Sequence, residues 1–243
     1  MNPPLKFWLV SLAAAVAVIA TMGLGHWQLT RAWSKEGLAA AIEARSALAP
    51  LANSGFVTQG FLSANLHRRA KVTGTWVTAH TVFLDNRQMD AKPGFYVLTP
   101  LLLQDSPAAV LVQRGWVPRN FQDRNRLPAV ATPSGLVQID GRIEAPPSKL
   151  FDLGSDGQGP IRQNLDMTAF ARETGLALLP VSLVQTAASD ATNDGLLRNW
   201  PVPVSGAGKN YGYAFQWFAL SALIAVLFGW FQFGKKYVAK RKP

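Results

Sequence analysis

The strongest pattern in the chain is a pair of long apolar runs, one near each end. Residues 7–30 carry no formally charged side chain, and residues 7–25 are almost wholly apolar. At about 1.5 Å per helical residue, that apolar stretch spans roughly 28 Å, close to the thickness of a bilayer's hydrocarbon core. It predicts a transmembrane helix over residues 7–26. A cleaved signal peptide is the alternative, but such a peptide usually has an apolar core of only about 7–15 residues.

The second apolar run covers residues 211–234 and is also uncharged. Its apolar side chains would surround a helix on all sides, whereas a helix at the edge of a soluble core keeps one polar face. Basic side chains follow at once, at Lys235, Lys236, Lys240, Arg241 and Lys242. Because Lys and Arg concentrate on the cytoplasmic side of a membrane, this run predicts a second transmembrane helix that ends in the cytoplasm.

Two crossings place both termini on the same side of the membrane. We therefore expect five parts in chain order: a cytoplasmic tail (1–6), a first transmembrane helix (7–26), an extracytoplasmic domain (27–210), a second transmembrane helix (211–234) and a basic cytoplasmic tail (235–243).

The polar middle of the chain alternates between short β-rich runs and turn residues. The first helix is expected to continue beyond the membrane until Pro50, because residues 27–49 keep a helical period. A short helix is predicted over 167–174, with Asp166 as N-cap and Gly175 at its end. Strands are predicted at 70–75, 81–88, 95–103, 109–117, 137–143 and 181–186. This order favours an α+β, mainly antiparallel β domain, built as a sheet or a small barrel, over a doubly wound parallel sheet.

The net charge of +10 does not indicate a nucleic-acid partner. Six of the 24 Lys and Arg residues lie in the two terminal tails, so the remaining 18 face 14 Asp and Glu residues. No segment between the tails concentrates basic and aromatic side chains as a phosphate-binding groove does. The chain has no Cys, which excludes disulfides, thiolate metal sites and thiol chemistry.

Catalytic patterns are missing from the sequence, so we expect a protein that is not an enzyme. There is no GxSxG motif, and the glycines of residues 154–159 lack the spacing of a dinucleotide-binding loop. The three histidines His26, His67 and His80 do not have the spacing of metal ligands. The acidic side chains near the predicted strands have no activated nucleophile beside them, and solvated surface groups are the simpler interpretation: Asp85, Asp90, Asp140 and Glu144.

His26 lies at the outer end of the first apolar run, where an imidazole could reach a haem between the two helices. Arg31 follows close by and could pair with a haem propionate or a lipid phosphate. The alternative is that both are ordinary polar residues at the membrane interface.

Five stretches of the chain together resemble the Surfeit-locus (Surf/Shy) family of cytochrome c oxidase assembly factors. Their order and spacing cover nearly the whole chain and match the two-helix topology. They are Gly25-His26-Trp27-Gln28-Leu29-Thr30-Arg31; residues 84–100, from Leu84-Asp85-Asn86-Arg87 to Gly94-Phe95-Tyr96-Val97-Leu98-Thr99-Pro100; Val110-Leu111-Val112-Gln113-Arg114-Gly115-Trp116-Val117-Pro118; Asn164-Leu165-Asp166; and Asn199-Trp200-Pro201 together with Tyr213-Ala214-Phe215-Gln216-Trp217-Phe218.

The resemblance implies a helper protein of a bacterial inner membrane that assists haem a insertion into subunit I of cytochrome c oxidase. It implies transient binding of haem a, and subunit I and haem a synthase as partners. Some members carry a His shortly before the Tyr-Ala of the second helix, and Asn210 occupies that place here. Asn is a poor iron ligand, which leaves His26 and Arg31 as the other candidate haem contacts. A membrane-anchored structural or ligand-binding envelope protein without a haem role is the alternative function.

The resemblance also points to residues for partner contact. Those of the helices are Trp27, Gln28, Tyr213 and Trp217, and those of the domain are Asn86, Arg87, Gly94, Arg114, Gly115 and Trp116. Asn86, Arg87, Arg114 and Trp116 belong to adjacent predicted strands and could form one polar and aromatic surface. Alternatively, Gly94 and Gly115 mark bulges, and Trp116 belongs to the core.

Overall fold

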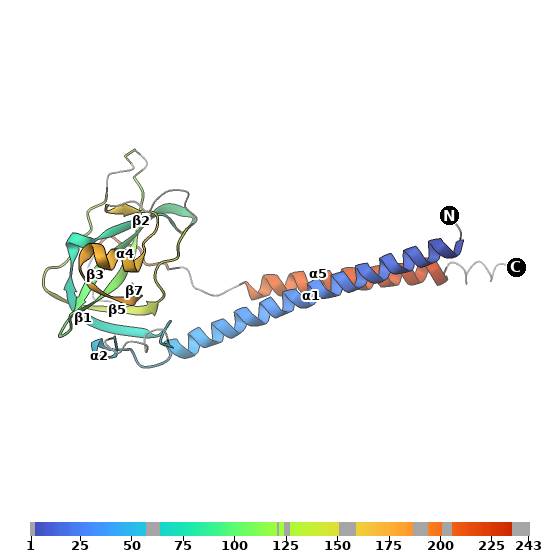
Figure 1. Ribbon diagram of the computed structural model, residues 1–243, viewed down its shortest axis with the longest axis horizontal. Coiled ribbons are helices and arrows are strands. Elements are labelled where there is room, and N and C mark those ends of the chain that lie inside the picture. Colours follow the sequence, from blue (N-terminus) through green and yellow to red (C-terminus); the bar gives the residue numbers. More distant parts are fainter. Residues whose placement is uncertain are drawn as a thin grey trace. The chain divides into compact units, whose positions relative to one another are not determined.

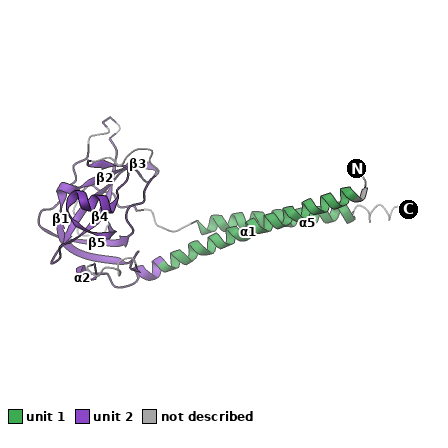
Figure 2. Ribbon diagram, in the orientation of Figure 1, with its two compact units in different colours: residues 1–41, 202–243 green, residues 42–201 purple. Residues whose placement is uncertain are grey.

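The chain consists of two compact units, which Figure 2 distinguishes by colour. One combines residues 1–41 with 202–243, and the other comprises residues 42–201. The computed structural model describes residues 3–56, 64–120, 122–123, 127–150, 159–186, 194–200 and 206–234. The predicted basic tail, 235–243, lies outside the described residues.

The first unit is a pair of long helices, α1 (Pro3–Ser46) and α5 (Ala207–Gly229). The end of α1, from residue 42 onwards, belongs to the second unit, and α5 continues into the π-helical turn η2 (Trp230–Gly234). Both helices are long and apolar enough to cross a membrane. They run antiparallel, so the start of α1 lies beside the end of α5 (Figure 1). The prediction that the first helix continues towards Pro50 is confirmed, because α1 ends at Ser46.

The contact between the two helices follows a seven-residue repeat. The less exposed positions of α1 include Ala14, Val18, Thr21, Gly25, Gln28, Ala32, Lys35 and Ala39, and those of α5 include Asn210, Ala214, Trp217, Ser221, Ile224 and Phe228. Alternating steps of four and three residues are typical of helices that cross at about 20° in a left-handed pair. We call this line of contact the seam. Small residues let the helices approach, and the ring of Phe218 packs over Gly25, where a Cβ would lie 2.8 Å from its Cε1 atom.

The second unit is built on a seven-stranded sheet. Its strands are β1 (Arg69–Trp76), β2 (Val82–Met89), β3 (Lys92–Leu103), β4 (Ala108–Pro118), β5 (Leu136–Glu144), β6 (Ile161–Arg162) and β7 (Ala177–Gln185). Their order is β1-β5-β7-β4-β3-β2-β6, and β1 also pairs with the end of β3. That last pairing closes five strands into a ring, so the small barrel is the correct choice between the two predicted architectures.

The prediction of a mainly antiparallel sheet is wrong, because the sheet is mixed. β4 pairs with β7 in parallel, and β2 pairs with β6 in parallel. The reason for the first parallel pair is that the chain reaches β7 through a connection containing the helix α4 (Met167–Thr174), and such a crossover returns a strand in the same direction.

Apolar side chains fill three neighbouring regions of this unit. The largest lies inside the strand ring and includes Val72, Leu101, Val112, Ile139 and Leu183. A second lies between the sheet and α4, where Phe170 packs with Leu84, Leu98 and Leu111. A third contains Phe83, Phe95, Val117 and Leu196.

The sequence predicted the local structure around α4 correctly. The Asp166 carboxylate accepts a hydrogen bond from the backbone N–H of Ala169 at 2.9 Å, and Gly175 ends the helix with a φ of +69°. Three short elements were not predicted: α2 (Asn53–Phe56), the 3-10 turn η1 (Thr78–His80) and β6. Of the glycine-containing stretch 154–159, the structure describes only Gly159.

Candidate functional site

A polar cluster interrupts the seam between α1 and α5. The side-chain amide of Asn210 donates to Oε1 of Gln28 at 2.5 Å, and Nζ of Lys35 donates to Oδ1 of Asn210 at 2.7 Å. Lys35 also reaches the carbonyl of Gly206 at 3.5 Å, at the start of α5. Asn210 is only 8 % exposed. Both ends of its amide therefore have partners, as a buried amide requires.

Such a cluster fixes how the two helices align. Buried polar side chains in an apolar helix pair are costly when unpaired, so a shift by one helical turn would break these contacts without replacing them. The Asn210–Gln28 contact therefore fixes the register in which the two helices pack along the seam. Tyr211 adds a peripheral contact, because its hydroxyl donates to Oε2 of Glu36 at 2.9 Å.

The remaining helix candidates lie around this cluster rather than in it. His26 is exposed and lies two residues before Gln28, a step of about 200° around a helix, so it does not face Asn210. The guanidinium of the exposed Arg31 stacks over the ring of Trp27 at 5.0 Å. Tyr213 is also exposed, whereas Trp217 is half-buried on the seam. The structure therefore separates His26 and Arg31 from Asn210.

In the strand domain, Trp116 and Gly94 form a tightly packed pair on adjacent strands. A Cβ at Gly94 would lie 2.5 Å from the Trp116 ring and 2.2 Å from the carbonyl oxygen of Val117, so no other residue fits there. Trp116 is 2 % exposed, and its indole N–H donates to the backbone carbonyl of Arg87 at 3.0 Å. This bond ties β4 to β2 across β3.

Arg87 is itself buried and holds two loops. Its Nη2 atom donates to the carbonyls of Ser148 and Gln163 at 2.9 and 3.1 Å. Burial lowers the pKa of the Arg87 guanidinium, and the nearby Tyr96 partly offsets that effect. The preceding residue, Asn86, is exposed with a φ of +58° at an irregularity in the β2–β3 pairing.

A second arginine, Arg114, lies almost fully buried beside the segment 194–200. It donates to Thr132 Oγ1 at 2.7 Å and to the Ala131 carbonyl at 2.8 Å, and it stacks over Trp76 at 4.7 Å. Its Nη2 atom lies 3.8 Å from Oδ2 of Asp194. Burial lowers the pKa of Arg114 to about 10, while Asp194 acts in the opposite direction.

Arg198 completes this group. It donates to Oδ2 of Asp194 at 2.5 Å and to the backbone carbonyl of Arg114 at 2.8 Å. Leu197 exchanges two backbone hydrogen bonds with Trp116, at 2.7 and 2.9 Å. The segment 194–200 is therefore held against β4 by the ion pair of Asp194 with Arg114 and by the backbone hydrogen bonds between Leu197 and Trp116.

The strand residues proposed for partner contact were expected either to form an exposed polar and aromatic surface or to belong to the core, and the structure shows the second arrangement for most of them. Arg87, Arg114 and Trp116 are buried, so together with Asn86 they do not form an exposed surface. The glycines are not the bulged residues. The β3–β4 register shifts at Arg114, and Gly94 and Gly115 instead allow close packing, the latter against Leu196. Whether any of the ten residues contacts a partner stays a prediction.

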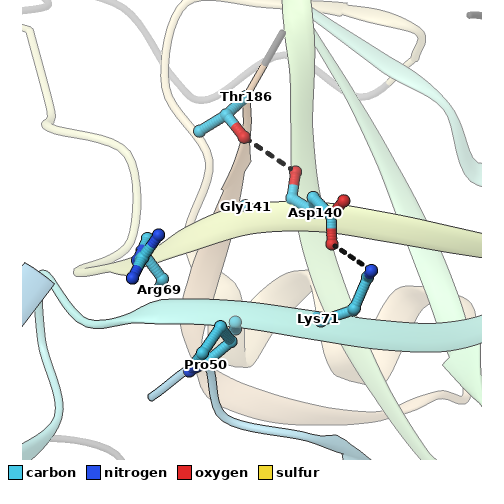
Figure 3. A pocket seen from close by; sticks show the side chains of 7 residues that line it. Pro50, Arg69, Lys71, Asp140, Gly141 and Thr186 are labelled. Carbon is cyan, nitrogen blue, oxygen red and sulfur yellow. Dashed lines mark hydrogen bonds and ion pairs between the residues drawn. The ribbon is translucent and has the colours of Figure 1, made fainter. Parts of the chain in front are cut away.

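A cavity of about 250 Å³ lies at the edge of the ring, where β1 and β5 meet the end of β7 (Figure 3). Its charged lining residues are Arg69, Lys71 and Asp140, and Pro50, Ala70, Gly141 and Thr186 complete it. Sequence reasoning considered Asp140 but missed Arg69 and Lys71. It also missed Lys35, Asp194 and Arg198. Ordinary charged residues of this kind carry no local signal until the fold brings their partners to them.

Comparison with known proteins identifies the family. A sequence model of the SURF1 family matches residues 15–222, which cover the strand domain and most of each helix. The chain belongs to the SURF1 family. It is 27 % identical over 262 aligned positions to a SURF1-like protein of Drosophila melanogaster, covering 99 % of this chain and 79 % of the relative. A SURF1-like protein of Monosiga brevicollis is 24 % identical, covering 84 % of this chain and 80 % of the relative.

A third relative has a more specific name. The cytochrome oxidase assembly protein SHY1 of Saccharomyces cerevisiae is 27 % identical over 99 residues, which cover 41 % of this SURF1-family chain and 25 % of the yeast protein. The family resemblance predicted from the five stretches is thereby confirmed.

The residues on the seam do not fit a haem ligated between the two helices. At the place where some members have a His, the buried Asn210 uses its amide on Gln28 and Lys35. Among the described residues of the helix pair, His26 is the one histidine that could ligate iron, and it is exposed and faces away from Asn210. Neither Asn210 nor His26 is therefore placed to ligate the iron of a haem held in the seam.

Proposed function

We propose that this SURF1-family protein is an assembly factor for cytochrome c oxidase, which assists the insertion of haem a into subunit I and is not an enzyme. The observation that carries the proposal is the family match over residues 15–222, because one relative in that family is named as a cytochrome oxidase assembly protein.

The architecture is suited to a helper that works at a membrane. The two candidate membrane helices are joined by the hydrogen bond between Gln28 and Asn210. If both cross the membrane in opposite directions, the strand domain lies on one side of the membrane and both termini lie on the other. We infer that the termini are cytoplasmic and that the domain is extracytoplasmic, in a bacterial inner membrane. Subunit I, an intramembrane protein, and haem a synthase are the proposed partners.

The buried charged side chains of the strand domain make contacts within the chain itself. Among the described residues, no group of three or more His, Cys, Asp or Glu side chains could hold a metal ion. The buried residues Arg87 and Arg114 bind backbone carbonyls, and Arg114 also lies near the carboxylate of Asp194. These contacts stabilise the domain and leave exposed side chains to make partner contacts.

Deletion of the gene tests the proposal. We expect loss of cytochrome c oxidase activity and of the haem a absorbance of membranes, while subunit I is still synthesised and other respiratory enzymes keep their activity. Expression of the native chain should restore both signals. Normal oxidase in the deletion strain would contradict the proposal and favour an envelope protein without a haem role. Turnover of a small substrate by the purified chain would instead indicate an enzyme.

A further inference from the structure

The outer face of the β1–β5 pair carries a ladder of charged side chains. Residues directly opposite each other on antiparallel strands point to the same face, with Cβ atoms about 4.5–5.5 Å apart. Arg69 lies opposite Arg142, and Lys71 lies opposite Asp140. The intervening residues Ala70 and Gly141 are buried on the other face, so the charged residues point outward.

The positive charges of this ladder are not fully balanced. Glu144 is occupied twice, because Arg142 Nε donates to it at 2.5 Å and His67 Nδ1 lies 3.0 Å from it. Lys71 lies 3.8 Å from Oδ1 of Asp140. Arg69 is exposed, and its guanidinium has no hydrogen bond or ion pair with any residue that the structure describes. Two like charges directly opposite each other destabilise a strand pair unless an anion lies between or beside them.

Arg69 borders the cavity at the edge of the ring. Figure 3 shows Arg69 and Lys71 on β1, Asp140 on β5, and dashed lines from Asp140 to Lys71 and to Thr186. No line joins Arg69 to another of the residues drawn, and Arg69 lines the cavity. A volume of about 250 Å³ accommodates one side chain or a small ion, and is below the range of typical drug-sized ligand pockets.

We infer that this cavity binds the carboxylate of an Asp or Glu side chain presented by a partner protein. Arg69 would take it bidentately, since the guanidinium fork matches a carboxylate, and Lys71 would add a point charge. Asp140 reduces the local charge of Arg69 and Lys71 from +2 to +1. That balance favours a singly charged carboxylate over a doubly charged phosphate. This carboxylate site goes beyond the proposed function, because it holds for any partner that offers an acidic side chain.

The test uses two peptides that differ only in charge, acetyl-Gly-Glu-Gly-amide and acetyl-Gly-Gln-Gly-amide, with inorganic phosphate as a third probe at equal ionic strength. Binding to the full chain in detergent is followed by the NMR signals of arginine Nε–H groups. We expect the Glu peptide to bind about tenfold more tightly than the Gln peptide, because only the Glu side chain carries a negative charge that can form an ion pair with the guanidinium. Phosphate should bind more weakly than the Glu peptide.

Matched variants locate the site. Arg69→Gln should abolish the preference for the Glu peptide, whereas Arg172→Gln, which removes the same charge from an exposed position on α4, should preserve it. Asp140→Asn should tighten phosphate binding about tenfold, because it removes the opposing negative charge. Unchanged melting temperatures in Arg69→Gln exclude misfolding. Equal peptide binding by native chain and Arg69→Gln would overturn the site. Tighter binding of phosphate than of the Glu peptide would overturn the assignment to a carboxylate.

Discussion

The side-chain amide of Asn210, on α5, donates to Oε1 of Gln28, on α1, at a distance of 2.5 Å. Both residues belong to the seam of an apolar helix pair, and Lys35 completes the cluster by donating to the other end of the Asn210 side chain. The position where some SURF1-family members have a His therefore serves here to align two helices.

Loss of the Asn210–Gln28 hydrogen bond should weaken the association of the two helices. The effect of substituting one of these residues should therefore depend on whether the other is still present. In a double-mutant cycle of Gln28→Ala and Asn210→Ala, we expect a coupling energy of about 0.5–1.5 kcal/mol. The chain has no Cys, so dyes on cysteines introduced at the exposed Leu12 and Leu227 can report helix separation during titration with SDS.

Ser34→Ala is the control for this cycle. The Ser34 hydroxyl bonds the carbonyl of Thr30 within its own helix, so the variant should show no coupling to Asn210→Ala. A coupling energy of zero between Gln28 and Asn210 would mean that the cluster does not hold the seam in register.

The arrangement of the seam also predicts the spectrum of the purified protein. When the chain is produced together with haem a biosynthetic enzymes and purified in detergent, we expect no stoichiometric Soret band, since Asn210 is engaged and His26 is exposed on another face. His26→Ala should leave the spectrum unchanged. A haem a band that disappears in His26→Ala would make His26 an iron ligand and contradict this view.

Gly94 should not tolerate any side chain. In Gly94→Ala, the new Cβ would collide with Trp116 and the Val117 carbonyl, and we expect a loss of about 1–3 kcal/mol in the free energy of unfolding of the domain. Thermal unfolding followed by tryptophan fluorescence measures it. Gly37→Ala, at an open helical position of α1, should leave the melting temperature of the domain unchanged. Equal stability of both variants would show that Gly94 is not packed as described.

The N-cap of α4 should give the domain a specific acid sensitivity. Hydrogen bonds from the Ala169 backbone and from Lys149 lower the pKa of Asp166 below its ordinary value of 3.8. A carboxylate with a lowered pKa in the folded state stabilises it above the ordinary pKa, and this contribution is lost as the pH falls through the folded pKa. Asp166→Ala should therefore melt at a lower temperature at neutral pH, and this gap should narrow below pH 3.8.

Asp166→Asn serves as the comparison, because Asn keeps a cap acceptor but does not titrate. At neutral pH its melting temperature should lie between those of the native chain and Asp166→Ala, because Asn keeps the hydrogen-bond acceptor but not the negative charge. A gap for Asp166→Ala that is independent of pH would show that the ionised carboxylate does not provide the stabilisation.

The parts of this fold that were predicted correctly depend on local patterns. The boundaries of α4 follow from Asp166 and Gly175, and the length of α1 from a helical period that ends before Pro50. The parallel pairing of β4 and β7 depends on how the chain returns through α4, which strand patterns do not contain. Burial of Arg87 and Arg114 was not expected either, since their backbone carbonyl partners come from distant segments.

The proposed role in inserting haem a into subunit I can be tested by the ratio of haem a to subunit I in cytochrome c oxidase from a deletion strain. Subunit I is captured by an affinity tag, and haem a is quantified from the reduced-minus-oxidised spectrum. We expect a ratio well below that of the wild type, restored when the native chain is expressed. An unchanged ratio in the deletion strain would contradict it.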